Sequence, residues 1–587
     1  MQSSIWFSII FLIGVIALFV GVVCWQKAEE PCSGVKWLAI CIVAIMCFHT
    51  MAAGIMGVLH IPINIISIGM LDLAAGGGLL FHSKKKGKWQ RYEWKGADVI
   101  FVVLLFIGIV LFALKRYTSS LSINYYSVDP AVHFQTAMYV VNTQSIYGMF
   151  HAALNNALLI ELFSPAFNIS SYYHIFVLGD VLNLGLAGIM FYGAIRDFCS
   201  DRFTRLIAIV LPFLYLAGYE GNSTLFGFVY LGMGVTIVAY IITIADMFLQ
   251  EKINKWFNIL LLCLGCYGLF ECYVMFMPVV FIAVLSAILT KQIARKKLFS
   301  VETVIWGLAI FLVPCILGLY YIFSGVFTGG TTVDSAISVE GGSYRELYSN
   351  FLPYIPFAFY GLYRGIKGRM NRLVMHLLPM WMLFVGVLLE LGCVGKVSSY
   401  YYFKTYYVLW LLVLWMCFYG ITQISVKERA LVVIYSFIQI ALMANCVFEI
   451  EMRIYNKNAL FNPAPKAEVY NSLLDFQIEV MKFPPYADGK TDLYKYVYDS
   501  LLEQEGTVIC VSNEEDYWWY QAITNQSNNG INYYVTDLEE EFANLPDNIN
   551  YVCVLYDCQG YTENQPYLDS LERVFVTDAG FIAEIAK

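Results

Sequence analysis

The sequence predicts an all-α polytopic membrane bundle of about fourteen transmembrane helices, followed by a C-terminal extracytoplasmic α/β domain. Hydrophobic residues make up 59% of the 587 residues and charged residues 14%, and the mean hydropathy is +0.63, far above that of water-soluble domains. Apolar runs long enough to cross a bilayer recur up to residue 448. From Glu449 onward the chain has 24 acidic and 8 basic residues, so this tail belongs in an aqueous compartment.

Each predicted crossing is an apolar run near the 20 residues that an α-helix needs to span a hydrocarbon core about 30 Å thick. Loop charge decides two of them. The stretch 257–290 is flanked by basic loops on both sides, so it is expected to form a hairpin that turns near Glu271. The short run 351–364 is expected to cross because omitting it would leave the basic segment RGIKGRMNR outside. The predicted crossings are 5–25, 37–59, 63–82, 97–115, 172–195, 203–219, 224–249, 257–270, 273–290, 302–323, 351–364, 373–394, 405–423 and 430–448.

The basic residues of the loops predict the orientation of the bundle. The strongest signal is KKKGK at 84–88, and loops rich in Lys and Arg favour the cytoplasm. With this loop inside, most other basic loops also lie inside and both termini are extracytoplasmic. The basic run is then juxtamembrane, where it orients a helix and contacts lipid, and it provides no surface for nucleic acid. The sequence therefore predicts a multi-pass protein of the cell membrane.

Three regions follow from these assignments. Residues 1–96 form additional N-terminal transmembrane helices, 97–448 form the main transmembrane domain, and 449–587 form the soluble domain. The first outer loop of the main domain, 116–171, is long and contains two semi-apolar stretches whose spacing is helical, as expected for helices lying on the membrane surface. In the tail, strands are expected at 506–513, 531–537 and 550–557, and helices at 467–481 and 491–505.

The sharpest local pattern is NYYSVDPAVHF at 124–134, which places Asp129 and His133 one helical turn apart in the first outer loop. Two interpretations are open. If Pro130 begins a helix, Asp129 is its N-cap, and its carboxylate accepts hydrogen bonds from backbone N–H groups. In the functional interpretation Asp129 is a general base for a hydroxyl group, and His133 orients that base or the substrate.

From residue 97 onward the chain resembles the GT-C superfamily of polytopic membrane glycosyltransferases. The long first outer loop, its surface helices and the soluble C-terminal domain match as architecture, and Asp129 with its neighbours matches as a motif. The resemblance implies transfer of a sugar from a polyprenyl-phosphate carrier to an acceptor hydroxyl on the outer face, with Asp129 as a catalytic residue, and the helical spacing adds His133 to the expected catalytic residues. The implied partners are the lipid bilayer, a polyprenyl-phosphate-linked sugar donor, and a glycan or protein acceptor.

The chain departs from the family pattern in one respect. Many members have paired acidic residues in this loop, whereas Asp129 is followed by Pro130 and the next acidic residue is Glu161. A divalent metal prefers several oxygen ligands, so the metal is unknown: a divalent ion is possible and no cofactor is assigned.

Substrate-binding residues are expected around a second pattern, VSSYYYFKTYYVLW at 397–410. Here Lys404 and aromatic residues such as Tyr402 lie where an outer loop enters a helix. Some GT-C-like proteins are similar here, which implies that Lys404 binds the carrier phosphate, a role suited to a compact ammonium group. A lysine that snorkels to the interface is the alternative. Arg345 is a further candidate for the phosphate, and Glu271 for the acceptor.

Other functions remain compatible with the sequence. A polymerase or ligase acting on polyprenyl-pyrophosphate-linked glycans would depend on outer-loop arginines, for which the chain offers Arg116 and Arg345. A lipid or glycan transporter without covalent chemistry would need a polar path, and Asp72, Asp180 and Asp246 keep that possibility open. An assembly protein without a substrate is a third alternative.

Overall fold

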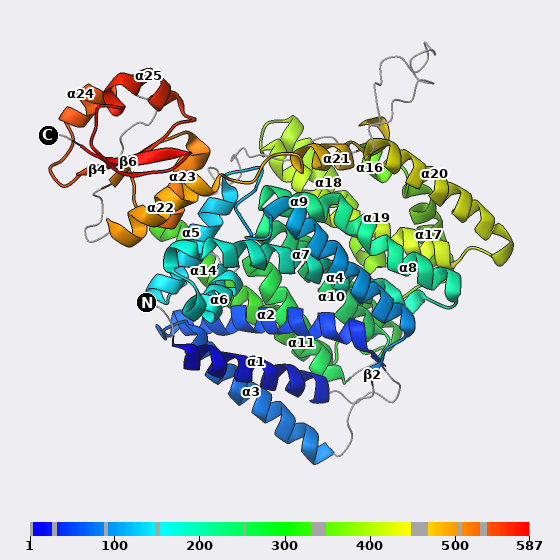
Figure 1. The fold of residues 1–587 in the computed structure, drawn as a ribbon. Coiled ribbons are helices and arrows are strands. Elements are labelled where there is room, and N and C mark those ends of the chain that lie inside the picture. The colour runs from blue at the N-terminus through cyan, green and yellow to red at the C-terminus, as the bar shows by residue number, and fades with distance from the viewer. Residues whose placement is uncertain are drawn as a thin grey trace, which may run out of the picture.

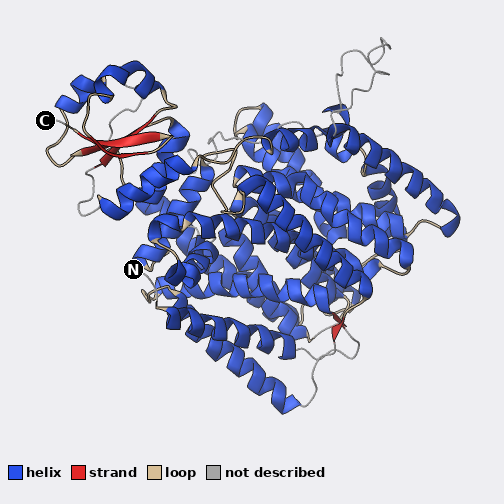
Figure 2. Ribbon diagram, viewed as in Figure 1, coloured by secondary structure: helices blue, strands red, loops and turns tan. Residues whose placement is uncertain are grey.

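The computed structural model consists of a large helical bundle with a small sheet-containing unit at one end (Figure 1). Helices dominate, and the main sheet lies in the C-terminal unit (Figure 2). Twelve helical segments of the described residues are long and apolar enough to span a membrane, so the chain is a multi-pass membrane protein. The described residues are 4–25, 32–86, 92–146, 153–251, 254–329, 348–447, 468–501, 508–528 and 537–585.

The N-terminal helices form a layer on one side of the bundle (Figure 1). Two glycine pairs bring the first and third of them into backbone contact. A Cβ added at Gly14 would lie 2.3 Å from the carbonyl oxygen of Gly69, and one added at Gly21 would lie 2.9 Å from that of Gly76. Such close approach of small residues is a common way for membrane helices to associate. The three helices are α1 (Ile5–Trp25), α2 (Gly34–Val58) and α3 (Ile65–Lys86).

The central bundle surrounds α10, which is buried along almost its whole length. Lateral contacts from α2, α7, α11, α18 and α19 cover it. The helices of this bundle are α4 (Gly96–Tyr117), α7 (Tyr173–Ile195), α8 (Arg202–Tyr215), α9 (Gly221–Phe226), α10 (Val229–Leu249), α11 (Lys255–Cys272), α12 (Met277–Ala294), α13 (Val301–Gly307), α14 (Val313–Gly329), α16 (Tyr348–Phe351), α17 (Ile355–Lys367), α18 (Leu373–Cys393), α19 (Ser399–Thr422) and α20 (Arg429–Val447).

Twelve of the fourteen predicted crossings coincide with the twelve candidate spans of the described residues. The predicted crossing at 351–364 is replaced by α17, which begins at Ile355 beside Pro356 and has 13 residues. At about 1.5 Å per residue this helix is shorter than a bilayer core. The predicted crossing at 430–448 coincides with α20, and because part of this helix lies outside the residues that were searched for spans, the crossing stays a prediction.

The predicted hairpin within 257–290 is confirmed. The first helix, α11, ends at Cys272, and the second, α12, begins at Met277. A single 3-10 turn, Val274–Phe276, joins them. Glu271 therefore lies in the last turn of α11, at the point where the chain reverses.

Ion pairs gather at one end of the bundle and join loops that the charge pattern placed on the same side. Lys36 Nζ lies 2.7 Å from Asp197, Arg372 lies 3.3 Å from Asp246, and Arg429 lies 2.5 Å from Asp201. Strand β2 (Tyr92–Glu93), which follows the lysine-rich loop, lies away from the C-terminal sheet (Figure 1). The grouping of these loops thus agrees with the prediction, while their assignment to the cytoplasm stays a prediction.

The first outer loop contains the two predicted surface helices. They are α5 (Asp129–Thr143) and α6 (Ala153–Phe163), and both pack against the bundle rather than crossing it. A buried carboxylate fixes α6 to the N-terminal layer, because Glu161 accepts a hydrogen bond of 2.8 Å from the backbone N–H of Ile65. This contact fixes the first residue of α3 against α6.

The tail forms an α/β unit with a four-stranded sheet in the order β3-β4-β6-β5. Strands β3 and β4 are parallel, and β6 is antiparallel to both of its neighbours. Predicted strands at 506–513 and 550–557 correspond to β3 and β4, while most of the predicted strand 531–537 lies outside the described residues. The elements are α21 (Glu468–Val480), α22 (Asp488–Ser500), β3 (Val508–Val511), α23 (Glu514–Thr524), α24 (Leu538–Ala543), β4 (Tyr551–Leu555), α25 (Gln559–Leu568), β5 (Arg573–Val576) and β6 (Gly580–Glu584).

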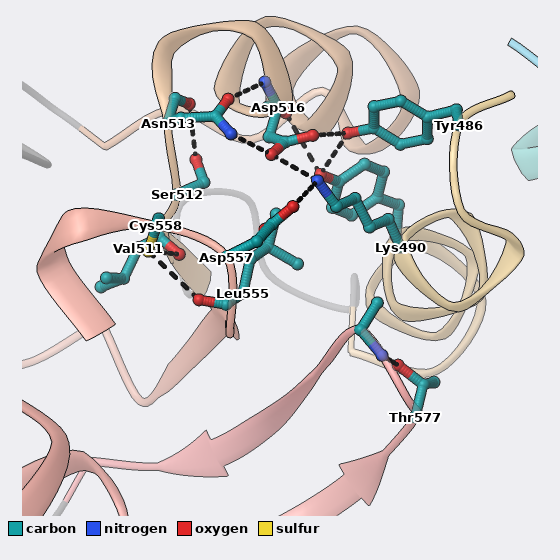
Figure 3. Close-up of polar contacts among 12 residues, drawn as sticks. Tyr486, Lys490, Val511, Ser512, Asn513, Asp516, Leu555, Asp557, Cys558 and Thr577 are labelled. Carbon is teal, nitrogen blue, oxygen red and sulfur yellow. Dashed lines mark hydrogen bonds and ion pairs between the residues drawn. The ribbon is translucent and has the colours of Figure 1, made fainter. Parts of the chain in front are cut away.

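A polar network fastens α22 to the carboxyl ends of β3 and β4 (Figure 3). Lys490 Nζ lies 2.8 Å from the buried carboxylate of Asp516 and 2.6 Å from Asp557. Asp516 also accepts hydrogen bonds from Asn513 and from the hydroxyl of Tyr486. Burial lowers the pKa of Lys490, but the two carboxylates outweigh it and hold the pKa above its ordinary value. Because each charge is compensated within the network, its role is structural.

The tail is anchored on the membrane bundle by specific contacts. Arg116, fully buried at the end of α4, donates a hydrogen bond to the carbonyl of Val480, and the N–H of Tyr486 donates to the carbonyl of Ile123 at 2.8 Å. Trp519 of α23 is also fully buried and stacks on Tyr125 of the first outer loop. These contacts bring α23 of the tail beside α5.

Helix α17 offers a test of this packing. A Cβ at Gly361 would lie 2.3 Å from the backbone carbonyl of Met416, whereas a Cβ at Gly386 of α18 would meet nothing within 4 Å. We expect Gly361→Ala to destabilise the protein by about 1–3 kcal/mol, because two backbones must separate. Thermal unfolding of the purified protein in detergent measures this. Gly386→Ala is the matched control and should leave the melting temperature unchanged or slightly raised; equal effects of the two substitutions would contradict the close backbone contact between α17 and α19.

Candidate functional site

The segment that carries Asp129 and His133 is fixed by the turn Leu225–Tyr230, which connects α9 to α10. The N–H of Tyr126 donates to the carbonyl of Leu225 at 2.9 Å, and Ser127 Oγ donates to the carbonyl of Phe226 at 2.7 Å. The chain before α5 is thereby held against the entrance of the most buried helix in the bundle.

Gly227 sets the position of α5 on this turn. Its φ of +72° is in the left-handed region, and a Cβ there would lie 2.0 Å from Cγ of Pro130. The carbonyl oxygen of Gly227 lies 3.1 Å from Nδ1 of His133. Since a carbonyl accepts, Nδ1 carries the proton, and Nε2 of the neutral ring is an acceptor.

The N-cap interpretation of Asp129 is wrong. The N-cap is Val128, which already has αR backbone angles and gives no side-chain capping bond, so Asp129 is the first residue of α5 and Pro130 the second. The Asp129 side chain is half-buried, and within the described part of the chain its carboxylate has no hydrogen bond or ion pair. It is therefore available to a ligand.

Lys404 lies on the other side of the same turn. The residue is 3% exposed, and its Nζ lies 3.7 Å from the ring centre of Phe228 and 4.4 Å from that of Tyr400. Among the described residues, Lys404 has no hydrogen-bonding or ion-pair partner. Cation–π contacts offset part of the cost of burying an ammonium group, about 2 kcal/mol in a desolvated setting. A buried cation without an anion is otherwise unfavourable, so this arrangement favours binding of an anionic ligand.

Asp129, His133 and Lys404 lie within electrostatic range of one another. Burial lowers the pKa of His133 to about 4, the charge of Asp129 and the Gly227 carbonyl oppose this change, and the charge of Lys404 adds to it. Asp129 and Lys404 do not form an ion pair with each other. The site therefore places an aspartate, a neutral imidazole and a lysine around one turn.

The structure does not bring the other expected residues to this group. The carboxylate of Glu271 is buried and interacts with Tyr267 one turn earlier on α11. The hydroxyl of Tyr402 is paired with that of Tyr406, on a side of α19 away from Lys404. Arg345 lies outside the described residues. A neighbour of Glu271 does touch the site, since Cys272 Sγ donates to the carbonyl of Tyr230 at 3.3 Å.

Three aromatic residues complete the site and were missed from the sequence. Tyr400 precedes Lys404 by four residues, so helical spacing could have identified it. Phe228 contacts Lys404, and the ring of Tyr230 lies 4.3 Å from that of His133. These two come from a distant part of the sequence, and their contacts depend on the packing of α5 and α19 against α10.

Acidic residues within the helices are mostly occupied by partners. Asp72 binds Nε2 of His49 at 2.9 Å, and Asp180 accepts a hydrogen bond of 2.7 Å from Tyr125. Glu220 accepts one of 2.7 Å from Tyr215, and Asp246 accepts one from the backbone of Leu373. The contacts of Asp72, Asp180 and Asp246 each join two segments of the bundle, while that of Glu220 lies within one helical stretch, so packing explains these groups.

Metal-binding clusters were sought among the donors of the described residues. No group of three or more His, Cys, Asp or Glu side chains in these stretches could hold a metal ion.

Comparison with known proteins gives a similarity of fold. No family model and no curated protein matches the sequence. The chain is similar to the crystal structure of ArnT from Cupriavidus metallidurans in the apo state, with 10% identity and a TM-score of 0.49 over 84% of this chain and 99% of that one. The structure of ArnT from the same organism bound to undecaprenyl phosphate gives 8% identity and a TM-score of 0.47 over 84% and 98%. At these values the likeness assigns no role to individual residues.

The lowered pKa of His133 predicts a pH dependence of stability. In the unfolded chain a histidine has a pKa of about 6.5, so between about pH 4 and 6.5 the unfolded state binds more protons than the folded state. Stability should therefore fall as the pH drops through this range. His133→Gln, which does not titrate, should reduce the slope of melting temperature against pH. As a control, Asn544→Ala removes an exposed side chain that does not titrate, and should keep the slope. If His133→Gln has the same slope as the wild type, the pH dependence does not come from a lowered pKa of His133.

Proposed function

We propose that the chain is a membrane glycosyltransferase that moves a sugar from a polyprenyl-phosphate carrier to an acceptor hydroxyl on the outer face of the membrane. The observation that carries the proposal is the ammonium group of Lys404, which is buried beside the rings of Phe228 and Tyr400 and has no anion among the described residues. A phosphate group of a lipid carrier supplies the missing charge.

The residues support a direct displacement at the sugar. The acceptor oxygen forms a bond to the anomeric carbon while the bond from that carbon to the carrier phosphate breaks. The proton of the acceptor hydroxyl goes to the carboxylate of Asp129, and the bonding electrons leave with the polyprenyl phosphate. Lys404 stabilises the negative charge that grows on this leaving group.

His133 acts as a positioning residue in this scheme. Its Nδ1 is fixed on the carbonyl of Gly227 and its ring packs on Tyr230, so the orientation of the imidazole is defined. The neutral ring offers Nε2 as an acceptor for a sugar hydroxyl without adding charge beside Asp129.

Two apolar cavities flank α4 and could receive the prenyl chain. One of about 660 Å³ is lined mainly by aliphatic and aromatic side chains of α1, α2, α4, α6 and α7. The other, of about 250 Å³, lies between α4, α8, α9 and α21 and includes Leu225, the first residue of the turn beneath the site. An apolar cavity that reaches this turn supports a lipid-borne donor.

The sidedness belongs to the same proposal. Nucleotide sugars are confined to the cytoplasm, so an enzyme facing outward needs a donor delivered in the lipid phase. The site lies beside α5 and the tail, away from the ion pairs of the basic loops. An extracytoplasmic location of both termini is part of this proposal.

Transfer of a labelled sugar from a polyprenyl-phosphate donor to acceptors in membranes tests the two charged residues. Asp129→Asn should lower kcat by about 10²–10⁴-fold, because the general base is lost. Lys404→Met should lower it by about 10²–10³-fold, while the melting temperature stays equal or rises, because an unpaired buried charge is replaced by an apolar chain of similar length.

Matched controls are Asp547→Asn and Lys396→Met, which alter exposed residues outside the site and should keep full transfer. If Asp129→Asn and Lys404→Met insert normally and transfer sugar at the wild-type rate, the proposed mechanism is excluded.

A further inference from the structure

A polar cleft of about 680 Å³ lies between the surface helix α5 and the tail. One wall is the face of α5 that follows the site, with Gln135, Thr136, Tyr139 and Asn142, and the other includes Tyr498 of α22 and Asn525 at the end of α23. Its size is within the range of small-molecule and oligomer sites.

The walls of the cleft are held in place by contacts outside it. Trp519 of α23 packs against Phe134 of α5 and Tyr125, and Ser170 Oγ donates a hydrogen bond of 3.1 Å to Asp499 of α22. The cleft is therefore built by the docked tail, and a ligand would meet preformed walls.

The lining is uncharged and rich in groups that can donate and accept hydrogen bonds. None of the described residues that line the cleft is Asp, Glu, Lys, Arg or His. Gln135 and Asn142 form no hydrogen bond through their side chains with the described protein, so their amides are available. Amide groups can donate and accept as sugar hydroxyls do, and the tyrosine rings offer flat apolar faces.

We infer that this cleft binds a neutral oligosaccharide, the acceptor of the transferred sugar. That the oligosaccharide is the acceptor rests on the proposed function. That the ligand is a neutral oligosaccharide rests on the lining of the cleft. Thr136 follows Asp129 by seven residues, which is about two helical turns or about 10 Å along α5, on the same side of the helix. An oligosaccharide in the cleft thus extends toward the carboxylate that activates its terminal hydroxyl.

A peptide or an acidic glycan fits this lining less well. The described walls are helices and the end of a helix, so they offer no strand edge to pair with an extended peptide backbone. The described lining residues include no cation for a carboxylated or sulfated sugar. The observations therefore favour a neutral saccharide over both.

Binding to the full-length protein in detergent tests the inference without any donor. The probes are neutral hexasaccharides of glucose, mannose and galactose, with hexagalacturonate as the acidic probe and a serine-rich decapeptide as the peptide probe. We expect isothermal titration calorimetry to detect at least one neutral probe. The double variant Gln135→Ala with Asn142→Ala should weaken it by about tenfold or more, as expected for the loss of two hydrogen-bonding groups.

Controls separate a binding defect from misfolding and from failure of the proposed reaction. Asn544→Ala removes an exposed asparagine of the tail outside the cleft and should bind like the wild type. Asp129→Asn should still bind the neutral hexasaccharide even though it cannot transfer sugar. If the wild type transfers no sugar but the cleft variants lose binding at an unchanged melting temperature, the proposed function fails and the cleft assignment stands.

Three outcomes overturn the inference. They are failure of every neutral probe to bind, tighter binding of hexagalacturonate or the decapeptide, and equal affinity of the wild type and the double variant for the neutral probe. Where transfer is active, the double variant should raise KM for a hexasaccharide acceptor about tenfold with kcat unchanged, since the cleft lies away from the reacting atoms.

Discussion

The turn Leu225–Tyr230 holds the polar site together, because both halves of the site contact it. Backbone carbonyls of the turn receive the segment that leads into α5, and the ring of Phe228 lies against the ammonium group of Lys404. The turn itself is the entrance of α10, which other helices cover along almost its whole length. Its position is thus fixed by the packing of the bundle, and the relative position of carboxylate and ammonium follows from it.

The electrostatic character of the site follows from burial. Lys404 stays in a nearly closed aromatic setting, and the described residues give it no carboxylate within contact distance, although several other buried charges among the described residues are paired. Arg372 and Lys36, for example, each contact an aspartate. The ion pairs of Lys36 and Arg372 fasten helices to one another, whereas the proposed function gives Lys404 a phosphate as its partner.

Much of the architecture follows from local sequence. Apolar length predicted the twelve spanning helices, loop charge predicted the hairpin at Glu271, and helical spacing predicted α5 and α6. Strands β3 and β4 were predicted because each is a short apolar run buried in the structure. Strand β5 was missed because most of its residues are exposed, so its sequence carries no core pattern. The run 351–364 was misassigned because charge alone supported it, and its helix is too short.

The site was less predictable than the fold. Asp129 and Lys404 stand out in the sequence as a charged group beside a proline and as a cation beside tyrosines. Their proximity depends on contacts between distant segments, which a single sequence does not report. The N-cap prediction for α5 failed for a local reason, since Val128 enters the helical conformation one residue earlier than the proline suggested. Glu271 and Tyr402 have suitable chemistry but have partners on their own helices.

The contact of Pro130 with Gly227 has a consequence for how this protein can change over time. The proline ring occupies the volume that any side chain at 227 would need, and the backbone there has a conformation that glycine adopts at little cost. The two positions are therefore locked to each other. A side chain at position 227 would require a smaller residue at position 130 and would move the neighbouring Asp129, so the two positions are expected to change together.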